Sequence, residues 1–347
     1  MSSSRKLVCQ TLEFSDPCRI PRQLWLLPWA NINYPAQVLA IQAEYPDDLM
    51  HAPQALRQRP QISGDPFTPG VYVDEWGCTF ENKQHGIIGE VKQSLLKDCN
   101  DIAAIKPPQE FLSLDISEIN AVCRKTDKFV LSGCCPRPFE RLQFLRGTEN
   151  VMVEMMTDPA AISAALAKIH QFYLKEVELW AKTEVDALFF MDDWGSQNSL
   201  LIPPKIWRDM FRPLYADYIS IAHAHGKKAF MHSDGYILEI IPDLIELGLD
   251  ALNCQIFCIG IDNLAKSFRH KITFWGEMDR QQLLPNAETS EIRHAVRTVY
   301  DRLYCGGGVI AQLEFSPGAK PDNVAATFDE WNRIHTQLYM GNPGKNS

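Results

Sequence analysis

Hydrophobic and polar positions alternate in two distinct rhythms over the C-terminal two-thirds of the chain. Short, almost entirely apolar runs are separated by longer segments with apolar residues at helical spacing. The predicted strands cover 129–136, 185–195, 228–235, 250–255, 272–279 and 309–315, and the predicted helices cover 158–184, 203–226, 236–248, 262–270, 288–308 and a last segment from about 323. Because parallel strands are buried on both faces, this alternation predicts a parallel sheet covered by helices.

The number of strand–helix units favours one of two α/β folds. It fits an eightfold (β/α)8 TIM barrel better than an open sheet, and the alternation alone leaves the open sheet as an alternative. We therefore expect a single barrel domain over residues 1–347, with 1–90 as an N-terminal extension. Within that extension, 19–29 is the candidate first strand, and the aromatic, acidic segment 69–91 is a lid-like excursion over the barrel mouth.

Composition and charge argue against several classes of protein. The chain has 34 Lys and Arg against 43 Asp and Glu, a net charge of −9, and no basic stripe, which disfavours nucleic-acid binding. No apolar stretch approaches the ~20 residues of a membrane span, and the start of the chain lacks a signal-peptide core, so we expect a cytoplasmic protein. Ten scattered cysteines without a secretory signal predict reduced thiols.

Polar side chains stand at the ends of most predicted strands: Asp192, Asp193, His232, Asp234, Gln255, Glu277, Asp279 and Glu314. In a barrel enzyme the catalytic residues gather at the carboxyl ends of the strands. One shared active-site mouth explains why so many titratable groups occur at these positions.

Two adjacent strand ends carry the strongest candidates for catalysis. Side chains alternate along a strand, so His232 and Asp234 point the same way and can share a ligand, a proton or a metal. The alternative is that His232 is a satisfied interior histidine and Asp234 caps the next helix. Of Asp192 and Asp193, only one can face inward as a general base or ligand-binding carboxylate, and the other caps a loop or pairs with an arginine.

Aromatic residues beside acids are candidates for holding a flat substrate. The sequence "DEWG" at 74–77 places Asp74 next but one to Trp76, and Trp194 follows the paired aspartates. Gln255, Glu277 and Asp279 are further candidate substrate-binding residues. Tryptophan also anchors loops on cores, which remains the alternative for both Trp residues.

Together, "DEWG", "FFMDDWG", "FMHSDG" and "ITFWGEMD" occur in an order that resembles the uroporphyrinogen decarboxylase-like superfamily over most of residues 70–330. The resemblance implies a (β/α)8 barrel. It also implies one of two activities: decarboxylation of uroporphyrinogen, or transfer of a methyl group to or from a corrinoid.

The motifs favour the methyltransferase branch. True decarboxylases carry a Met-Arg-Gln-Ala-Gly-Arg-Tyr-like motif whose arginines hold propionates, and the matching stretch 19–35 lacks it. Thiol-directed methyltransferases hold zinc with His-x-Cys and a second Cys. Here His232 matches, Asp234 replaces the first Cys, and Glu314 stands near the second. The resemblance thus implies either a site for Zn²⁺ or another divalent ion at these three residues, or a metal-free site with Asp234 as acid or base.

We therefore expect a corrinoid (cobalamin)-dependent methyltransferase that acts on a small molecule. The corrinoid is expected on a separate carrier protein, and a homodimer is a further expectation. One alternative is a decarboxylase, which predicts several Arg side chains at the mouth. Another is a non-catalytic corrinoid or tetrapyrrole binder, in which His232→Ala leaves ligand binding intact.

Overall fold

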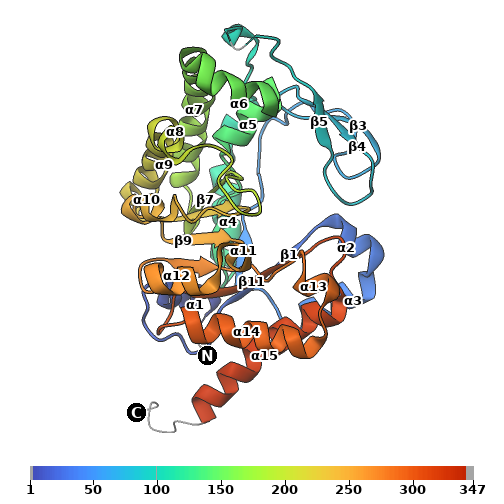
Figure 1. Cartoon of the computed structure of the whole chain (residues 1–347), viewed down its shortest axis with the longest axis vertical. Coiled ribbons are helices and arrows are strands. Elements are labelled where there is room, and N and C mark those ends of the chain that lie inside the picture. The colour runs from blue at the N-terminus through green and yellow to red at the C-terminus, as the bar shows by residue number, and fades with distance from the viewer. Residues whose placement is uncertain (1–2, 99, 341–347) are drawn as a thin grey trace. The chain divides into compact units, whose positions relative to one another are not determined.

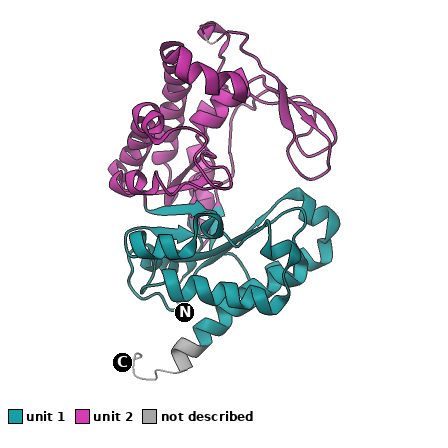
Figure 2. Cartoon of the chain, in the orientation of Figure 1, with its two compact units in different colours: residues 1–50, 127–129, 250–347 teal, residues 51–126, 130–249 magenta. Residues whose placement is uncertain are grey.

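The computed structural model describes residues 3–98 and 100–340, with side chains up to residue 336. The chain divides into two compact units, shown in Figure 2. Unit 1 comprises residues 1–50, 127–129 and 250–347, and unit 2 comprises 51–126 and 130–249. Both units contribute strands to the larger sheet.

The larger sheet has eight strands in the order β1-β11-β10-β9-β8-β7-β6-β2. Figure 1 labels β1, β7, β9 and β11 among them. Their bounds in chain order are β1 Arg22–Leu26, β2 Leu49–His51, β6 Phe129–Leu131, β7 Ala187–Met191, β8 Lys228–Ser233, β9 Ala251–Cys254, β10 Thr273–Trp275 and β11 Val309–Phe315. The pairings with a defined register are parallel. With the helices between the strands, this is the (β/α)8 barrel fold that the apolar pattern predicts.

Helices follow the strands in each unit. Those of unit 1 are α1 Ser4–Leu12, α2 Pro28–Asn33, α3 Pro35–Glu44, α11 Ile256–Ile259, α12 Ile261–Phe268, α13 Leu283–Asn286, α14 Thr289–Leu303 and α15 Pro321–Met340. Those of unit 2 are α4 Ile116–Lys125, α5 Pro138–Arg146, α6 Thr148–Thr157, α7 Pro159–Ala181, α8 Pro204–Met210, α9 Arg212–Ala224 and α10 Ile241–Glu246, with 3-10 turns at Ile102–Ala104 and Gln109–Leu112. No described helix is both long and apolar enough to cross a membrane.

Prolines explain where the predicted helices differ from the observed ones. The predicted helix 203–226 is two helices, α8 and α9, which meet at Phe211 and Arg212. Pro213 lacks a backbone N–H and disfavours helical geometry at the residue before it, so it fits only the first turn of a new helix. Pro242 acts in the same way, and α10 therefore begins at Ile241 instead of residue 236.

The segment predicted to be a lid forms a small antiparallel sheet of its own. Its strands are β3 Gly70–Val73, β4 Thr79–Asn82 and β5 Glu90–Gln93, in the order β3-β4-β5. The "DEWG" turn joins β3 to β4, and Figure 1 shows this sheet apart from β7, a parallel strand of the same unit. It contributes one wall of the cavity described below.

Candidate functional site

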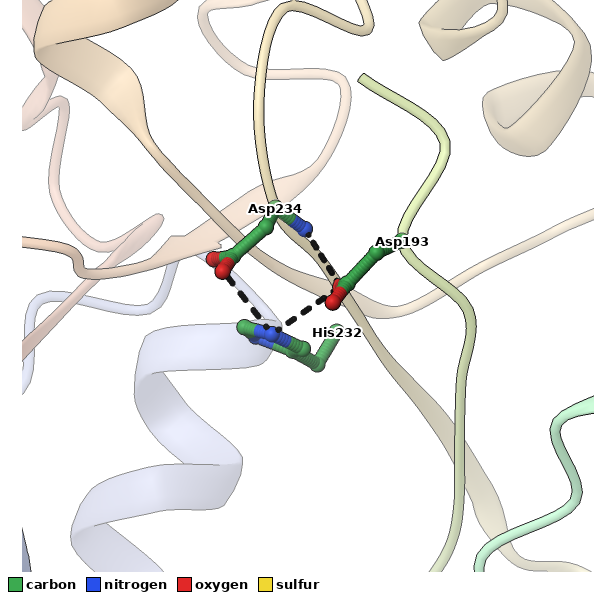
Figure 3. A group of neighbouring side chains, drawn as sticks. All are labelled: Asp193, His232 and Asp234. Carbon is green, nitrogen blue, oxygen red and sulfur yellow. Dashed lines mark hydrogen bonds and ion pairs between the residues drawn. The ribbon is translucent and has the colours of Figure 1, made fainter. Parts of the chain in front are cut away.

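Two neighbouring strand ends in unit 2 bring an imidazole and two carboxylates together (Figure 3). The register of β7 and β8 places Met191 opposite His232. His232 Nε2 lies 3.5 Å from Asp193 Oδ1 and 3.5 Å from Asp234 Oδ1. The backbone N–H of Asp234 donates to Asp193 Oδ1 at 3.0 Å. His232 and Asp234 thus point the same way, as strand alternation predicts, and Asp193 is the inward member of the aspartate pair.

Two glycines allow the loops after β7 and β8 to touch. A Cβ on Gly195 would lie 2.3 Å from the backbone nitrogen of Tyr236, and one on Gly235 would lie 2.1 Å from the carbonyl oxygen of Gly195. The backbone N–H of Gly195 donates to the carbonyl of Asp234 at 3.1 Å. Only residues without a Cβ permit this approach, which holds Asp193 beside Asp234.

The neighbouring Asp192 has a structural role. It is fully buried, and its carboxylate accepts hydrogen bonds from the backbone N–H groups of Phe139 at 2.9 Å and Glu140 at 2.8 Å and from the Tyr215 hydroxyl at 2.7 Å. It therefore caps α5. Burial raises the pKa of Asp192 well above its ordinary value, with a further rise from the Glu140 charge, and the three hydrogen bonds oppose that rise. These contacts match the capping alternative for Asp192.

The donor set around His232 fits a divalent metal ion. Asp193, His232 and Asp234 each offer one ligand atom, and these atoms lie within 4.8 Å of one another. Metal–ligand bonds of about 2.1 Å in tetrahedral geometry separate neighbouring ligand atoms by about 3.4 Å, close to both His–Asp distances. The side chains of Asp193 and Asp234 are 37% and 26% exposed, so the cluster opens to one side. One nitrogen and two oxygens make a harder site than His-x-Cys, suited to Zn²⁺ and other divalent ions.

A large cavity lies in the same unit, between the β3–β5 sheet and helices α5 and α7. Its volume is about 760 Å³, within the range of small-molecule sites. The polar and aromatic residues of its wall include Tyr72, Asp74, Glu75, Trp76, Phe80, Glu90, Phe111, Cys135, Arg137, Glu140, Arg141, Phe144, Tyr173 and Glu176. Asp74 and Trp76, which the sequence marks as candidates for ligand contact, thus lie in a cavity wall.

Asp74 organises one side of this cavity. It forms an ion pair with Arg141 and accepts hydrogen bonds from the backbone N–H groups of Trp76 at 3.0 Å and Cys78 at 2.7 Å. The guanidinium of Arg141 also lies 4.8 Å from the centroid of the Trp76 ring. The cavity therefore already stabilises one cation with a carboxylate and an aromatic face.

Trp194, by contrast, does not reach a cavity. It is fully buried, stacks on Phe139 with a centroid distance of 4.1 Å, and donates from Nε1 to the Tyr215 hydroxyl at 2.9 Å. It anchors its loop on the core, which was the alternative to its predicted role as a wall for a flat ligand.

The remaining candidates belong to unit 1. Asp279 Oδ1 accepts the backbone N–H groups of residues 281 and 282 at 2.8 Å, just before α13. Arg280 lies 2.7 Å from Glu314 and 3.5 Å from the buried Glu277. Gln255 precedes α11 as its N-terminal flanking residue. Glu314 therefore has a guanidinium partner in its own unit. The third member of the metal-compatible cluster is Asp193, whereas the sequence predicts Glu314 there.

Sequence reasoning missed Arg137, Glu140, Arg141 and Glu176. Arg137 follows directly on the predicted strand 129–136 and Glu140 lies three residues further on, so the strand-end argument could have included them. Glu176 shares a helix face with Phe172 and Trp180, and an acid on an apolar face signals a special environment.

The fold and this site define a class of protein: a (β/α)8 barrel with an acidic, histidine-containing cluster at its strand ends. The family model for uroporphyrinogen decarboxylase (URO-D) matches residues 70–334, and the chain belongs to that family.

One of two similar solved structures supports the fold. A methyltransferase from Methanosarcina mazei superimposes with a TM-score of 0.71 and 13% identity, covering 96% of this chain and 100% of that one. A B12-independent methionine synthase from Shewanella sp. W3-18-1 gives a TM-score of 0.49 and 10% identity, with 87% and 86% covered. No protein with a curated description matches the sequence.

Proposed function

We propose that the protein is a methyltransferase that moves a methyl group between a corrinoid, bound on a separate carrier protein, and a small molecule held at the Asp193–His232–Asp234 cluster. The observation that carries the proposal is the position of this cluster. His232 and Asp234 occupy the His-x-Cys position by which the sequence resembles the thiol-directed methyltransferases, and Asp193 supplies a third donor 3.5 Å from the imidazole.

The chain's own residues would orient the substrate and manage its proton. His232, almost fully buried, and the partly exposed Asp193 and Asp234 would hold a divalent ion, which when bound acts as a Lewis acid toward a substrate heteroatom. The two carboxylates are also placed to accept a proton from a nucleophilic substrate before it takes the methyl group. Their position is fixed by the contact between the two glycine-containing loops.

The cavity arginines give less support to uroporphyrinogen decarboxylation. Arg137 and Arg141 do line the cavity, but carboxylates of the protein already face both: Glu140 lies 3.7 Å from Arg137, and Asp74 and Glu75 contact Arg141. A substrate with many carboxylates needs uncompensated cations. This balance of charges favours the methyltransferase proposal.

The decisive experiment is anaerobic absorption spectroscopy with methylcobalamin and a panel of acceptors: thiols, amines and tetrahydrofolate. The proposal predicts loss of the methylcobalamin band with at least one acceptor, and loss of that activity in His232→Ala and Asp193→Asn. Metal analysis of the same samples should find about one divalent ion per chain in the wild type and none in either variant.

A matched control is His170→Ala. His170 also faces a carboxylate, with Nε2 3.0 Å from Asp217, but it lies on helix α7 away from the strand ends. It should retain both activity and metal. A spectrum that never changes, together with unimpaired corrinoid binding by His232→Ala, would contradict the proposal and support the non-catalytic alternative. Turnover of uroporphyrinogen would support the decarboxylase.

A further inference from the structure

The wall of the cavity between the β3–β5 sheet and helices α5 and α7 carries more carboxyl groups than arginines. Arg141 is held by Asp74 and Glu75, and Arg137 is faced by Glu140. Glu90 pairs with Lys92, so Glu176 on α7 is the carboxyl group of the wall that forms no ion pair with a described residue. Among the residues that the structure describes, none donates a hydrogen bond to it, although it is only 4% exposed and lines the cavity.

A carboxyl group in this position is expensive to ionise. Burial, with a smaller contribution from the Glu75 charge, raises the pKa of Glu176 to about 8 against the opposing charges of Arg141 and Arg137. The other titratable groups that interact with Glu176 electrostatically are Tyr173, Cys134, Cys135 and Tyr218. Burial raises the pKa of each of these groups to about 11 or higher, or well above its ordinary value, so none of them titrates near pH 8. Burial also raises the pKa of Glu140 in the same wall, against the Arg137 charge, so a variant at Glu176 itself is needed to assign the titration.

The rest of the wall is aromatic. Six rings line the cavity: Tyr72, Trp76, Phe80, Phe111, Phe144 and Tyr173. Ring faces attract cations, and quaternary ammonium groups are typical occupants of such surroundings. Arg141, which lies over Trp76 at 4.8 Å and Phe144 at 5.4 Å, shows the same preference inside this cavity.

The geometry points to a binding site for a small organic monocation, a quaternary or fully substituted ammonium, with Glu176 as its counter-ion and the aromatic wall around its alkyl groups. A monocation supplies the missing positive charge, and its apolar substituents bury against rings. An organic anion would instead compete with Glu140 for Arg137. Binding of the cation does not depend on the proposed methyl transfer. Only its identity as methyl donor or acceptor rests on that function.

Binding can be measured by calorimetry on the full chain, without corrinoid. The probes are choline, tetramethylammonium and benzyltrimethylammonium, compared with 3,3-dimethylbutan-1-ol, the uncharged carbon analogue of choline, and with benzoate as an anion. We expect one cation per chain and at least about tenfold weaker binding of the neutral analogue, since the analogue lacks the charge that Glu176 requires.

The pH dependence tests the role of Glu176 directly. A quaternary ammonium keeps its charge at every pH, so only the protein titrates. Below pH 8 the pocket must release a proton to bind the cation, so affinity should be about tenfold higher at pH 9 than at pH 7 and level above that. Calorimetry in two buffers of different ionisation enthalpy should detect nearly one proton released at pH 7.

Glu176→Gln should abolish the preference for the cation over its neutral analogue and remove the pH dependence. Glu178→Gln, on the same helix but outside the cavity wall, should change neither, and thermal unfolding should show that both variants are folded. The inference is overturned if none of the three cations binds, if benzoate binds in their place, or if choline and its analogue bind equally. Any of these results would leave the proposed methyl transfer untouched, because methyl transfer could use another substrate. The cation site and the methyltransferase activity can therefore be refuted independently.

Discussion

The adjacent carboxylates Asp192 and Asp193 are expected to differ sharply in what they contribute. Asp192 accepts three hydrogen bonds from buried donors: the N–H groups of Phe139 and Glu140 and the hydroxyl of Tyr215. Leaving one buried donor without an acceptor costs about 1–3 kcal/mol. Asp192→Ala leaves all three donors without this acceptor and should therefore lower the free energy of unfolding by about 3–9 kcal/mol. Asp192→Asn keeps one acceptor oxygen but turns an amide toward the donors, so about 1–3 kcal/mol is expected.

Asp193→Asn should have the opposite profile. Its side chain is 37% exposed, and its partners are the imidazole of His232 at 3.5 Å and the backbone N–H of Asp234. An amide oxygen can still accept from that N–H, and a partly exposed ion pair contributes little, so the stability loss should stay below about 1 kcal/mol. If the proposed function is right, metal binding and methyl transfer should be lost.

The assay is urea unfolding followed by circular dichroism, with midpoints compared at unchanged slope. Asp209→Asn serves as the control, because that carboxylate forms an exposed pair with Lys205 and its loss should leave the midpoint unchanged. If Asp192→Ala unfolds at the wild-type midpoint, or if Asp193→Asn keeps full metal content and activity, the division of roles between the two aspartates is wrong.

Three further predictions concern the loops and the cavity. Gly195→Ala places a Cβ 2.3 Å from the backbone of Tyr236 and should cost about 1–3 kcal/mol of stability. On the proposed function it should also lose the metal. Gly226→Ala meets open space but has a φ of +67°, so it should cost about 1–2 kcal/mol of backbone strain and keep the metal; thermal unfolding and metal analysis check both. Glu176 binds its proton more tightly when folded, so its contribution to stability is complete below its unfolded pKa and is lost as pH rises to about 8. Compared with Glu176→Gln, the free energy of unfolding of the wild type should fall by about 1.4 kcal/mol per pH unit in that window. Urea unfolding at several pH values measures this difference, and identical pH profiles for the two proteins would contradict the prediction. Asp74→Asn should destabilise by about 3–5 kcal/mol, because it removes the closest carboxylate of the buried Arg141, while Glu184→Gln at the exposed pair with Arg124 should unfold like the wild type.

The parts of the site that could be predicted from the sequence are those that depend on short-range geometry. His232 and Asp234 are two residues apart on a strand, so their common direction follows from strand alternation. The contact of Asp193 with His232 depends on the parallel register of β7 and β8, which joins residues about forty positions apart. The strand order of a barrel predicts that such neighbours exist but leaves their relative offset open.

The cavity was harder to predict because its wall combines segments that are distant in sequence. Asp74 and Trp76 could be singled out as an acid beside an aromatic residue. Their partner Arg141 is 67 residues from Asp74, and no local pattern relates the two. Glu176 did leave a local signal, because it is an acidic residue on the buried face of α7. Hydrophobic periodicity alone treats such a residue as a polar interruption of the apolar face and does not mark it as functional.

The choice between Asp192 and Asp193 shows where local reasoning ends and what could extend it. Because side chains alternate along a strand, the carboxylates of Asp192 and Asp193 must point in opposite directions, and either one could have faced the His232 cluster. The answer depends on α5, whose N-terminal flanking residue is Arg137, with no side-chain cap of its own. Helix starts need acceptors for their first N–H groups. A helix that begins Arg-Pro-Phe-Glu after a strand therefore needs an acceptor from elsewhere, and Asp192, from the end of the neighbouring strand β7, provides it. An uncapped helix start next to an unexplained strand-end aspartate is thus a sequence signal that such a pair belongs together.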